Sequence, residues 1–158
     1  MPTRQEPAGG WLRGDEQRAW LAFMRVQLRM TYEMNRQLQA DNGLSLADYD
    51  VLTALSVSTD ERLPITALAV QIGWERSRLS HQVKRMAGRG LVSSEPGAAD
   101  RRVTEVALTD AGRRAIELAA PGHVDTVRQL FFAGLPPELV SPLAAALEKV
   151  NDHLRSLP

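Results

Sequence analysis

The 158-residue chain contains no cysteine. This absence excludes disulfides, thiolate metal sites and cysteine-based redox sensing, and it agrees with the cytoplasmic location that we expect for the protein. The chain also lacks any apolar run near the roughly 18 residues of a membrane-spanning helix, so we expect no membrane partner. Because residues 1–10 are polar and contain proline and glycine, we predict that residues 1–14 form a flexible tail and not a signal peptide.

Sequence signatures of catalysis are absent as well. There is no phosphate-binding loop of the P-loop type, no dinucleotide-binding glycine motif, no H-E-x-x-H and no G-x-S-x-G. The three histidines, His81, His123 and His153, are too far apart for a compact metal motif, and the carboxylates form no evident acid and base pair. We therefore expect neither an enzyme nor a cofactor nor a metal site.

The chain has no net charge, because 19 basic residues balance 19 acidic ones. A neutral protein has no long-range attraction for a polyanion such as DNA. The charges are segregated, however: residues 74–102 carry seven basic and three acidic side chains, whereas both flanking parts of the chain are acidic. Positive charge is thus a local feature, and a dimer would present it twice.

That basic segment begins with an amphipathic helix, residues 74–86. At about 100° per residue, Leu79, Val83 and Met86 share the face that we expect to be buried. The opposite face carries Ser77, Arg78, His81, Lys84 and Arg85. Such side chains hydrogen-bond to phosphates and base edges, and the arginine fork matches the O6 and N7 atoms of guanine. Taken alone, the stripe is equally readable as an ordinary solvated helix face.

The neighbouring segments favour DNA binding. A helix over 65–72 buries one stripe and ends at Gly73, and strands over 91–95 and 103–108 flank a turn at 96–102. An earlier helix begins at Leu46, after a Ser45 to Asp48 capping box, and ends near Val57. This order is a winged helix in outline, with one element for the major groove and a hairpin for the backbone or minor groove. We assign residues 45–108 to DNA binding.

The two ends of the chain are predicted to be helical. Residues 15–40 place apolar side chains on more than one face, and Leu139, Leu143, Leu147, Val150 and Leu154 form a seam in the last helix. Pro121 should kink a long helix over 110–133, and Pro142, with Ser141 as its cap, should restart the last one. A monomeric helical core is one interpretation. In so short a chain we favour a homodimer, with residues 15–44 and 109–158 as dimerisation helices.

In these segments the chain resembles the MarR family of winged-helix transcription regulators. The resemblance is carried by Leu68 to Gly73, by Val83 to Met86, by Gly88 to Val92 and by the wing motif. That motif has an Asp, an Arg two residues later and a Leu-Thr pair, and Asp100, Arg102 and Leu108-Thr109 match it without insertion or deletion. Glu75 departs from the usual helix cap, which is Ser or Asp. The similarity extends from about residue 15 to the C-terminus.

The resemblance implies a single, mainly α-helical domain with a small β-wing, flanked by dimerisation helices. It also implies a homodimer that binds a pseudo-palindromic operator in double-stranded DNA, and a repressor is favoured over an activator. The expected DNA-binding residues are Arg76, Ser77, Arg78, His81, Lys84, Arg85, Asp100, Arg101 and Arg102. The alternative is a winged-helix subunit that binds a protein or a small molecule and no longer reads DNA.

Effectors of the family resemble small aromatic or phenolic acids that bind between the dimerisation helices and the DNA-binding part. By this resemblance, the corresponding crevice is lined by the first helix, the second helix and the start of the long helix after the wing. Its candidate residues are Trp20, Met24, Gln27 and Tyr49. Ordinary core packing is the competing interpretation, since aromatic and methionine residues at helical spacing are usually core residues.

Overall fold

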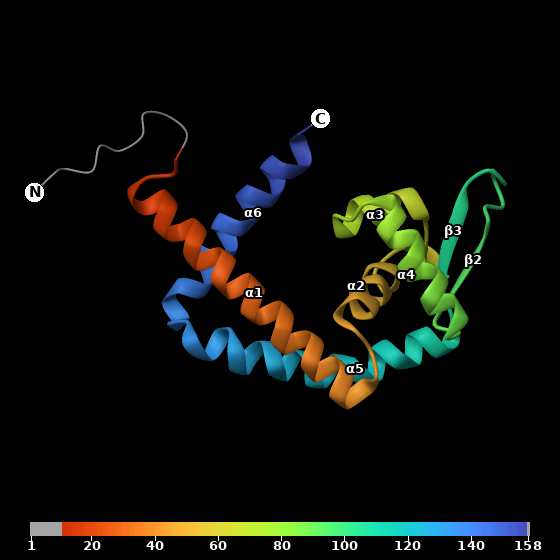
Figure 1. Cartoon of the computed structure of the whole chain (residues 1–158), viewed down its shortest axis with the longest axis horizontal. Coiled ribbons are helices and arrows are strands. Elements are labelled where there is room, and N and C mark those ends of the chain that lie inside the picture. The colour runs from red at the N-terminus through yellow and green to blue at the C-terminus, as the bar shows by residue number, and fades with distance from the viewer. Residues whose placement is uncertain (1–10, 158) are drawn as a thin grey trace, which may run out of the picture.

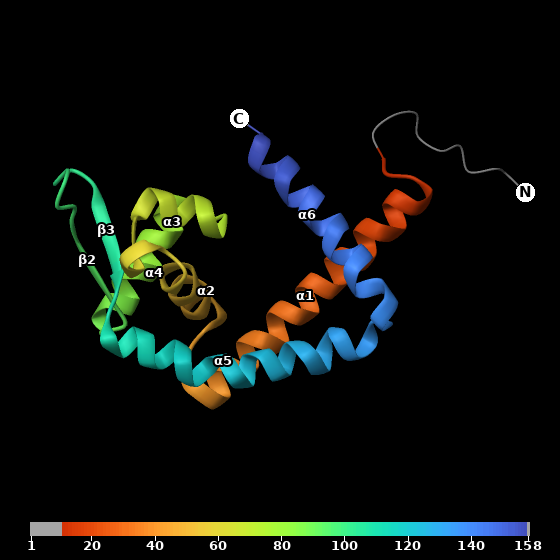
Figure 2. The same ribbon diagram turned by 180° about the vertical axis from the view of Figure 1, so that it is seen from behind.

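The computed structural model describes residues 11–157, so most of the predicted tail lies outside the described residues. The chain is mainly helical, with one small sheet, as predicted (Figures 1 and 2). The helices are α1 (Gly14–Asn42), α2 (Leu46–Ser56), α3 (Ile65–Ile72), α4 (Arg76–Gly88), α5 (Asp110–Leu130) and α6 (Val140–Ser156), and the strands are β1 (Arg62–Pro64), β2 (Val92–Pro96) and β3 (Thr104–Leu108).

The three helices of the winged-helix lobe, residues 45–108, begin and end close to where the sequence signals place them. The predicted capping box of α2 is confirmed, because the Ser45 side chain accepts from Asp48 N and Asp48 accepts from Ser45 N. Gly73 ends α3 in the left-handed region, at φ 70°, where glycine is favoured. α4 begins at Arg76, two residues later than predicted.

The wing contains a strand that the sequence did not predict. β1 pairs antiparallel with β3, and β3 pairs antiparallel with β2, giving the order β1-β3-β2. β1 has three residues and ends at Pro64, a residue that argues against a strand, so its sequence carries no local strand signal. β2 and β3 each begin one residue later than predicted.

The Leu-Thr pair and the glycine that follows it join the wing to α5. Thr109 caps α5 by accepting from Gly112 N at 3.0 Å, and its hydroxyl donates to Gly90 O at 2.6 Å. A Cβ atom at Gly112 would lie 2.1 Å from Leu91 O, so only glycine allows this approach of helix to backbone. Arg113 adds an ion pair with Glu61, next to β1. The wing and α5 are thus held together from both edges of the sheet.

The two long helices α1 and α5 cross and pack against each other, and α6 extends beyond them (Figures 1 and 2). α5 continues without a break through Pro121 and is followed by 3-10 turns at Phe132–Gly134 and Pro137–Leu139. The predicted Ser141 cap is wrong: α6 begins at Val140 after Leu139, and Ser141 lies inside its first turn. The preceding 3-10 turn leads directly into the helix, so no side-chain cap forms there.

No single helix in residues 11–157 is both long and apolar enough to cross a membrane. The pair of segments Asp110–Gly134 and Pro137–Ser156 meets that criterion only when taken together, and the two are bent by 102° relative to each other.

Candidate DNA interface and adjacent pocket

Helix α4 has one buried face and one exposed face, as its periodicity predicts. Leu79, Val83 and Met86 are buried in the core of the lobe. The opposite face is exposed and carries Arg76, Ser77, Arg78, His81, Lys84 and Arg85. Because the buried face fixes the rotation of the helix about its axis, the polar face points outward as a unit. This geometry suits insertion of a helix into the major groove of DNA.

The first turn of α4 is organised by an aromatic side chain. The Arg78 guanidinium lies over the Trp74 ring, 4.0 Å from its centroid. A cation on an aromatic face is held in place without losing its outward hydrogen-bonding edge. Glu75 is the N-cap residue of α4, where Ser or Asp is usual. Its side chain makes no capping hydrogen bond, so no side chain caps the first turn of this helix.

A buried polar network ties α4 to α2. Asp48, which is 2% exposed, accepts from Gln82 Nε2 at 2.6 Å and from Arg89 Nη1 at 2.7 Å. Arg89 also donates from Nη2 to the carbonyl oxygen of Gly43 at 2.8 Å. Arg89 belongs to the locally basic segment, yet its guanidinium is committed to these internal acceptors. It therefore positions the end of α4, and the positive charge available to DNA comes from the other basic residues.

The predicted pairing in the wing is confirmed. Asp100 Oδ1 accepts from the Arg102 backbone N at 3.0 Å and from Nε at 3.2 Å, and Oδ2 accepts from Nη2 at 3.3 Å. The side-chain and backbone hydrogen bonds from Arg102 lower the pKa of Asp100 below its usual value. The Arg102 side chain is 92% exposed, and Arg101 beside it is exposed too. The wing thus holds an oriented guanidinium at its tip.

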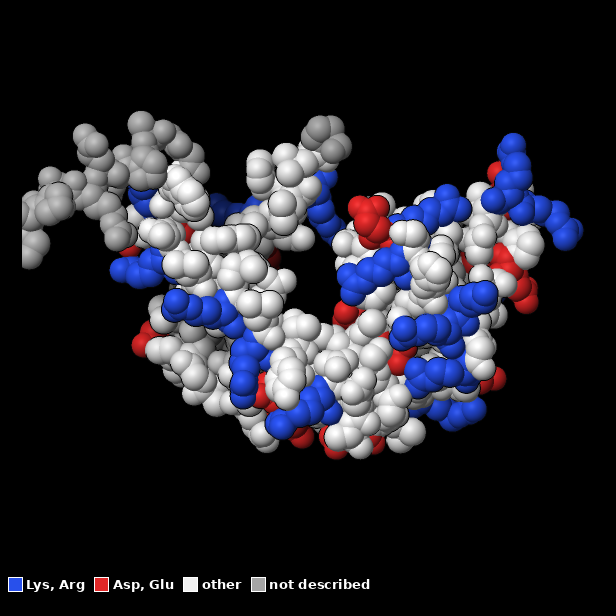
Figure 3. All heavy atoms as spheres, in the orientation of Figure 1, with Lys and Arg blue, Asp and Glu red and all other residues white. Residues whose placement is uncertain are grey.

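Basic side chains gather on two parts of the visible face (Figure 3). One group covers the side where α4 and the wing lie, and the other follows α1. Several arginines of α1 pair with carboxylates on the same helix: Arg29 and Arg36 both contact Glu33, and Arg18 contacts Asp15. No such ion pair is found for Arg76, Arg78, Lys84 or Arg85 within the part of the chain that the structure describes.

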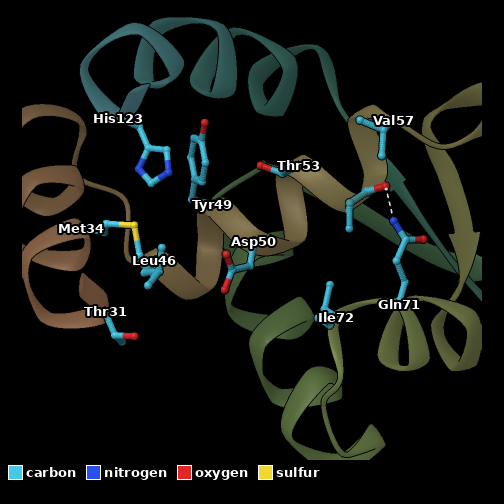
Figure 4. Close-up of a pocket in the computed structure, with 11 residues that line it drawn as sticks. Thr31, Met34, Leu46, Tyr49, Asp50, Thr53, Val57, Gln71, Ile72 and His123 are labelled. Carbon is cyan, nitrogen blue, oxygen red and sulfur yellow. Dashed lines mark hydrogen bonds between the residues drawn. The ribbon is translucent and has the colours of Figure 1, made fainter. Parts of the chain in front are cut away.

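A pocket of about 610 Å³ lies between α1, α2, α3 and α5 (Figure 4). Its lining residues are Thr31, Met34, Leu46, Tyr49, Asp50, Thr53, Ala54, Val57, Gln71, Ile72 and His123. Of the four predicted effector residues, Tyr49 lines this pocket. Trp20, Met24 and Gln27 lie nearer the start of α1 and are not among the lining residues; Trp20 packs on Phe23 and is 51% exposed.

Polar side chains are distributed around the pocket. The Tyr49 and His123 rings contact each other, tilted by 40° with their centroids 4.4 Å apart, and Asp50 is directed away from them (Figure 4). Burial lowers the pKa of His123, and it raises the pKa of Asp50 even though the nearby Arg78 charge acts in the opposite direction. Burial also raises the pKa of Tyr49. Sequence patterns singled out Tyr49 but gave no reason to place Asp50 and His123 in one cavity.

Outside the lobe, the long helices expose large apolar side chains. None of the residues of α6 is buried, and its exposed face includes Leu147, Val150 and Leu154. α1 exposes Trp20, Leu21, Phe23, Val26 and Leu28. Scattered exposed apolar residues need no explanation, whereas a continuous apolar face marks an interaction surface. These helices carry the apolar seam that the sequence assigned to dimerisation.

Known proteins with a similar sequence share this architecture. Residues 42–103 match the MarR family model. The chain is 32% identical over 141 residues to the HTH-type transcriptional repressor IacR of Pseudomonas putida, a match that spans 87% of this chain and 79% of that protein.

Two solved structures from Streptomyces coelicolor agree over almost the whole chain. AbsC, a MarR family transcriptional regulator, is 36% identical with a TM-score of 0.84, covering 94% of this chain and 100% of AbsC. Sco3205, a MarR family transcriptional regulator solved in complex with DNA, is also 36% identical with a TM-score of 0.84, covering 96% of this chain and 93% of Sco3205.

Proposed function

The chain belongs to the MarR family of DNA-binding transcriptional regulators, which are not enzymes, and from this premise we propose that it acts as a homodimeric repressor. The name of the Pseudomonas putida relative supports repression over activation. Two copies of the winged-helix lobe would bind an imperfectly palindromic operator, whose half-sites lie about one helical turn apart. The exposed apolar face of α6 supports the dimer, because this chain alone does not bury it.

One observation carries the proposal: the exposed basic face of α4 is backed by a buried face and by the Asp48 network. In this arrangement Arg78, His81, Lys84 and Arg85 contact base edges or phosphates in the major groove, and neighbouring Arg76 and Ser77 contact the backbone. The wing adds Arg101 and Arg102, with Asp100 orienting Arg102 toward a narrow minor groove. The alternative, a subunit that no longer reads DNA, leaves this exposed face without a use.

We test this by gel shift on the intergenic DNA beside the gene for this chain, with the wild type, Arg78→Ala, Lys84→Ala and Arg29→Ala. Replacing a side chain that contacts a base should lower the binding free energy by about 1–3 kcal/mol and relax the sequence preference at one position. Replacing one that contacts a phosphate should weaken binding to all DNA sequences alike. The control residue Arg29 is basic but pairs with Glu33 on α1, so its substitution should leave DNA binding unchanged. Unaltered affinity and selectivity in both α4 variants would exclude this use of the helix.

A small molecule that binds the pocket between the helical arms, residues 14–42 and 110–156, and the winged-helix lobe would regulate this repressor. A ligand shifts DNA affinity only if it prefers one spacing of the two α4 helices over another. The pocket suits this role because its walls come from both the arm helices α1 and α5 and the lobe helices α2 and α3. Titrating ligands into the protein-operator complex tests this, since binding without any change in operator affinity would exclude regulation by those ligands.

A further inference from the structure

The pocket beside Tyr49 has an unusual charge balance for a site that would hold an acid. Among its eleven lining residues, Asp50 is the only one with a carboxyl group, and no lysine or arginine lines the pocket. His123 does not supply a cation, because burial lowers its pKa and so favours the neutral ring. A carboxylate ligand would place a second negative charge next to Asp50 with no lining cation to offset it.

We propose that this pocket binds an aromatic ligand that carries a protonated amine, with the amine on the Asp50 carboxylate. This inference rests on the regulatory site proposed above, and it replaces the aromatic acid that the family resemblance implies. The ring of the ligand would lie against the apolar part of the wall, formed by Met34, Leu46 and Ile72. In Figure 4, the Asp50 side chain extends from α2 away from the Tyr49 and His123 rings, with Leu46 on one side of it and Ile72 on the other, so an amine on Asp50 would hold the ligand ring next to apolar lining residues.

The electrostatics of Asp50 support a cationic ligand. Burial raises the pKa of this carboxyl group, and the nearby positive charge of Arg78 does not cancel the effect. The protein therefore does not fully stabilise the negatively charged form of Asp50. A second cation that displaced water from the carboxylate would stabilise it, whereas a hydroxyl or an amide would do so less.

His123 provides a second polar contact. Its Nδ1 atom is buried and has no hydrogen-bond partner among the described residues. A buried polar atom without a partner costs free energy until a ligand or water satisfies it. If the His123 ring turned toward the cavity, a hydroxyl or N–H group on the ligand ring would donate to Nδ1, with the proton of the imidazole on Nε2. The ligand class is thus an aromatic amine, with a ring hydrogen-bond donor as an optional second contact.

The site also lies next to the DNA-contacting helix. The positive charge of Arg78 acts on the Asp50 carboxyl group, and the Arg78 guanidinium lies over the Trp74 ring at the start of α4. An ammonium group on Asp50 would place a second positive charge near Arg78, whose own charge already acts on this carboxyl group. Ligand occupancy would then be transmitted to the first turn of α4, where Trp74 is one of the three tryptophans that contribute to the fluorescence of the chain.

The experiment uses the full chain and two probes that share a phenyl ring and have a similar reach but carry opposite charges, phenethylamine and 3-phenylpropionate. Binding is followed by calorimetry and by Trp fluorescence for the wild type, Asp50→Asn and the control Asp125→Asn. Asp125 is an exposed carboxylate on α5 that pairs with Arg128 and does not line the pocket. Thermal melts establish that each variant is folded, and a gel shift without ligand establishes DNA binding independently.

We expect phenethylamine to bind the wild type and Asp125→Asn about tenfold or more tightly than 3-phenylpropionate, and Asp50→Asn to lose this preference. Equal or tighter binding of the acid to the wild type would overturn the proposal, and so would amine binding that is unchanged in Asp50→Asn. Absence of amine binding by a chain that still shifts its operator would also overturn it, while leaving the proposed repressor intact. A chain that does not bind DNA but prefers the amine would refute the repressor and retain this site.

Discussion

The winged-helix lobe and the helical arms, residues 14–42 and 110–156, differ in how they bury their apolar side chains. The lobe supplies most of the buried core, in which Leu52, Leu55, Leu68, Leu79 and Met86 are fully buried. The arms add Leu38 of α1 and Ala119 of α5 to this core, and α6 has no buried residue. We expect the exposed apolar faces of the arms to be covered by a second copy of the chain.

The largest effect should follow from a cavity in the lobe. Leu68 is fully buried between the helices of the lobe, so Leu68→Ala should lower the free energy of unfolding by about 2–5 kcal/mol. Urea denaturation measures this loss, and it should appear at every protein concentration. If the variant were as stable as the wild type, the lobe would not be the source of the stability of this chain.

The arms should respond differently. Replacing Leu147 and Leu154 together by glutamate places charges on the exposed apolar face of α6, and each substitution occurs twice in a symmetric dimer. We expect dimer affinity to fall about a hundredfold, roughly 3 kcal/mol, while circular dichroism still reports a folded lobe. Sedimentation over a range of concentrations measures the dimer. An unchanged dimer would remove α6 from the interface.

The joint between lobe and arm depends on Gly112. Its substitution by alanine forces a Cβ atom against Leu91 O, and we expect a loss of about 1–3 kcal/mol in stability from this overpacking. Gly88→Ala is the matched control, since it also lies in a helix but has nothing within 4 Å of its added Cβ. That control should be neutral or stabilising by about 0.5–1 kcal/mol in the same thermal melts. Equal effects of the two variants would contradict the close approach seen at Gly112.

The wing should affect DNA binding more than stability. Arg102→Ala removes an exposed ion pair, which contributes little to folding, and it also removes the oriented guanidinium at the wing tip. We expect operator affinity to fall by about 1 kcal/mol with almost no change in melting temperature. A variant that melted far lower but bound DNA normally would assign Arg102 a structural role.

The smallest effect concerns the contact of His123 on α5 with Tyr49 on α2. Burial lowers the pKa of His123 from its ordinary value of 6.5, so the unfolded chain binds more protons than the folded chain just below that pH. Stability should therefore fall as the pH drops below about 6.5. His123→Phe keeps an aromatic ring, and its melting temperature should decrease less than that of the wild type when the pH is lowered. The same decrease in both proteins would show that His123 does not titrate in this range.

Local signals in the sequence predict much of the lobe. The Ser45 and Asp48 capping box, Gly73 and the apolar periodicity of α4 each act within a few residues, and the structure confirms all three. The ion pair between Asp100 and Arg102 was also predictable from the sequence, because its partners are two residues apart.

Features that depend on distant partners were not predictable. β1 has three residues and is defined only by pairing with β3, and Gln82 and Arg89 find Asp48 across 34 and 41 residues of sequence. Arg89 therefore looked like a basic surface residue until the fold placed it on a buried carboxylate. The family resemblance indicated a crevice between the first, second and long helices and named Tyr49, but it did not name Asp50 and His123, which come from different helices and share no motif.

In the proposed function, two lobes joined by the arms bind one operator. The most direct test selects DNA sequences with the full chain in vitro and then measures the mass of the complex on the selected site by sedimentation. We expect an imperfect palindrome that holds two 17.4 kDa chains, with half-sites about one helical turn apart. A single chain bound with the same affinity to one isolated half-site would contradict it.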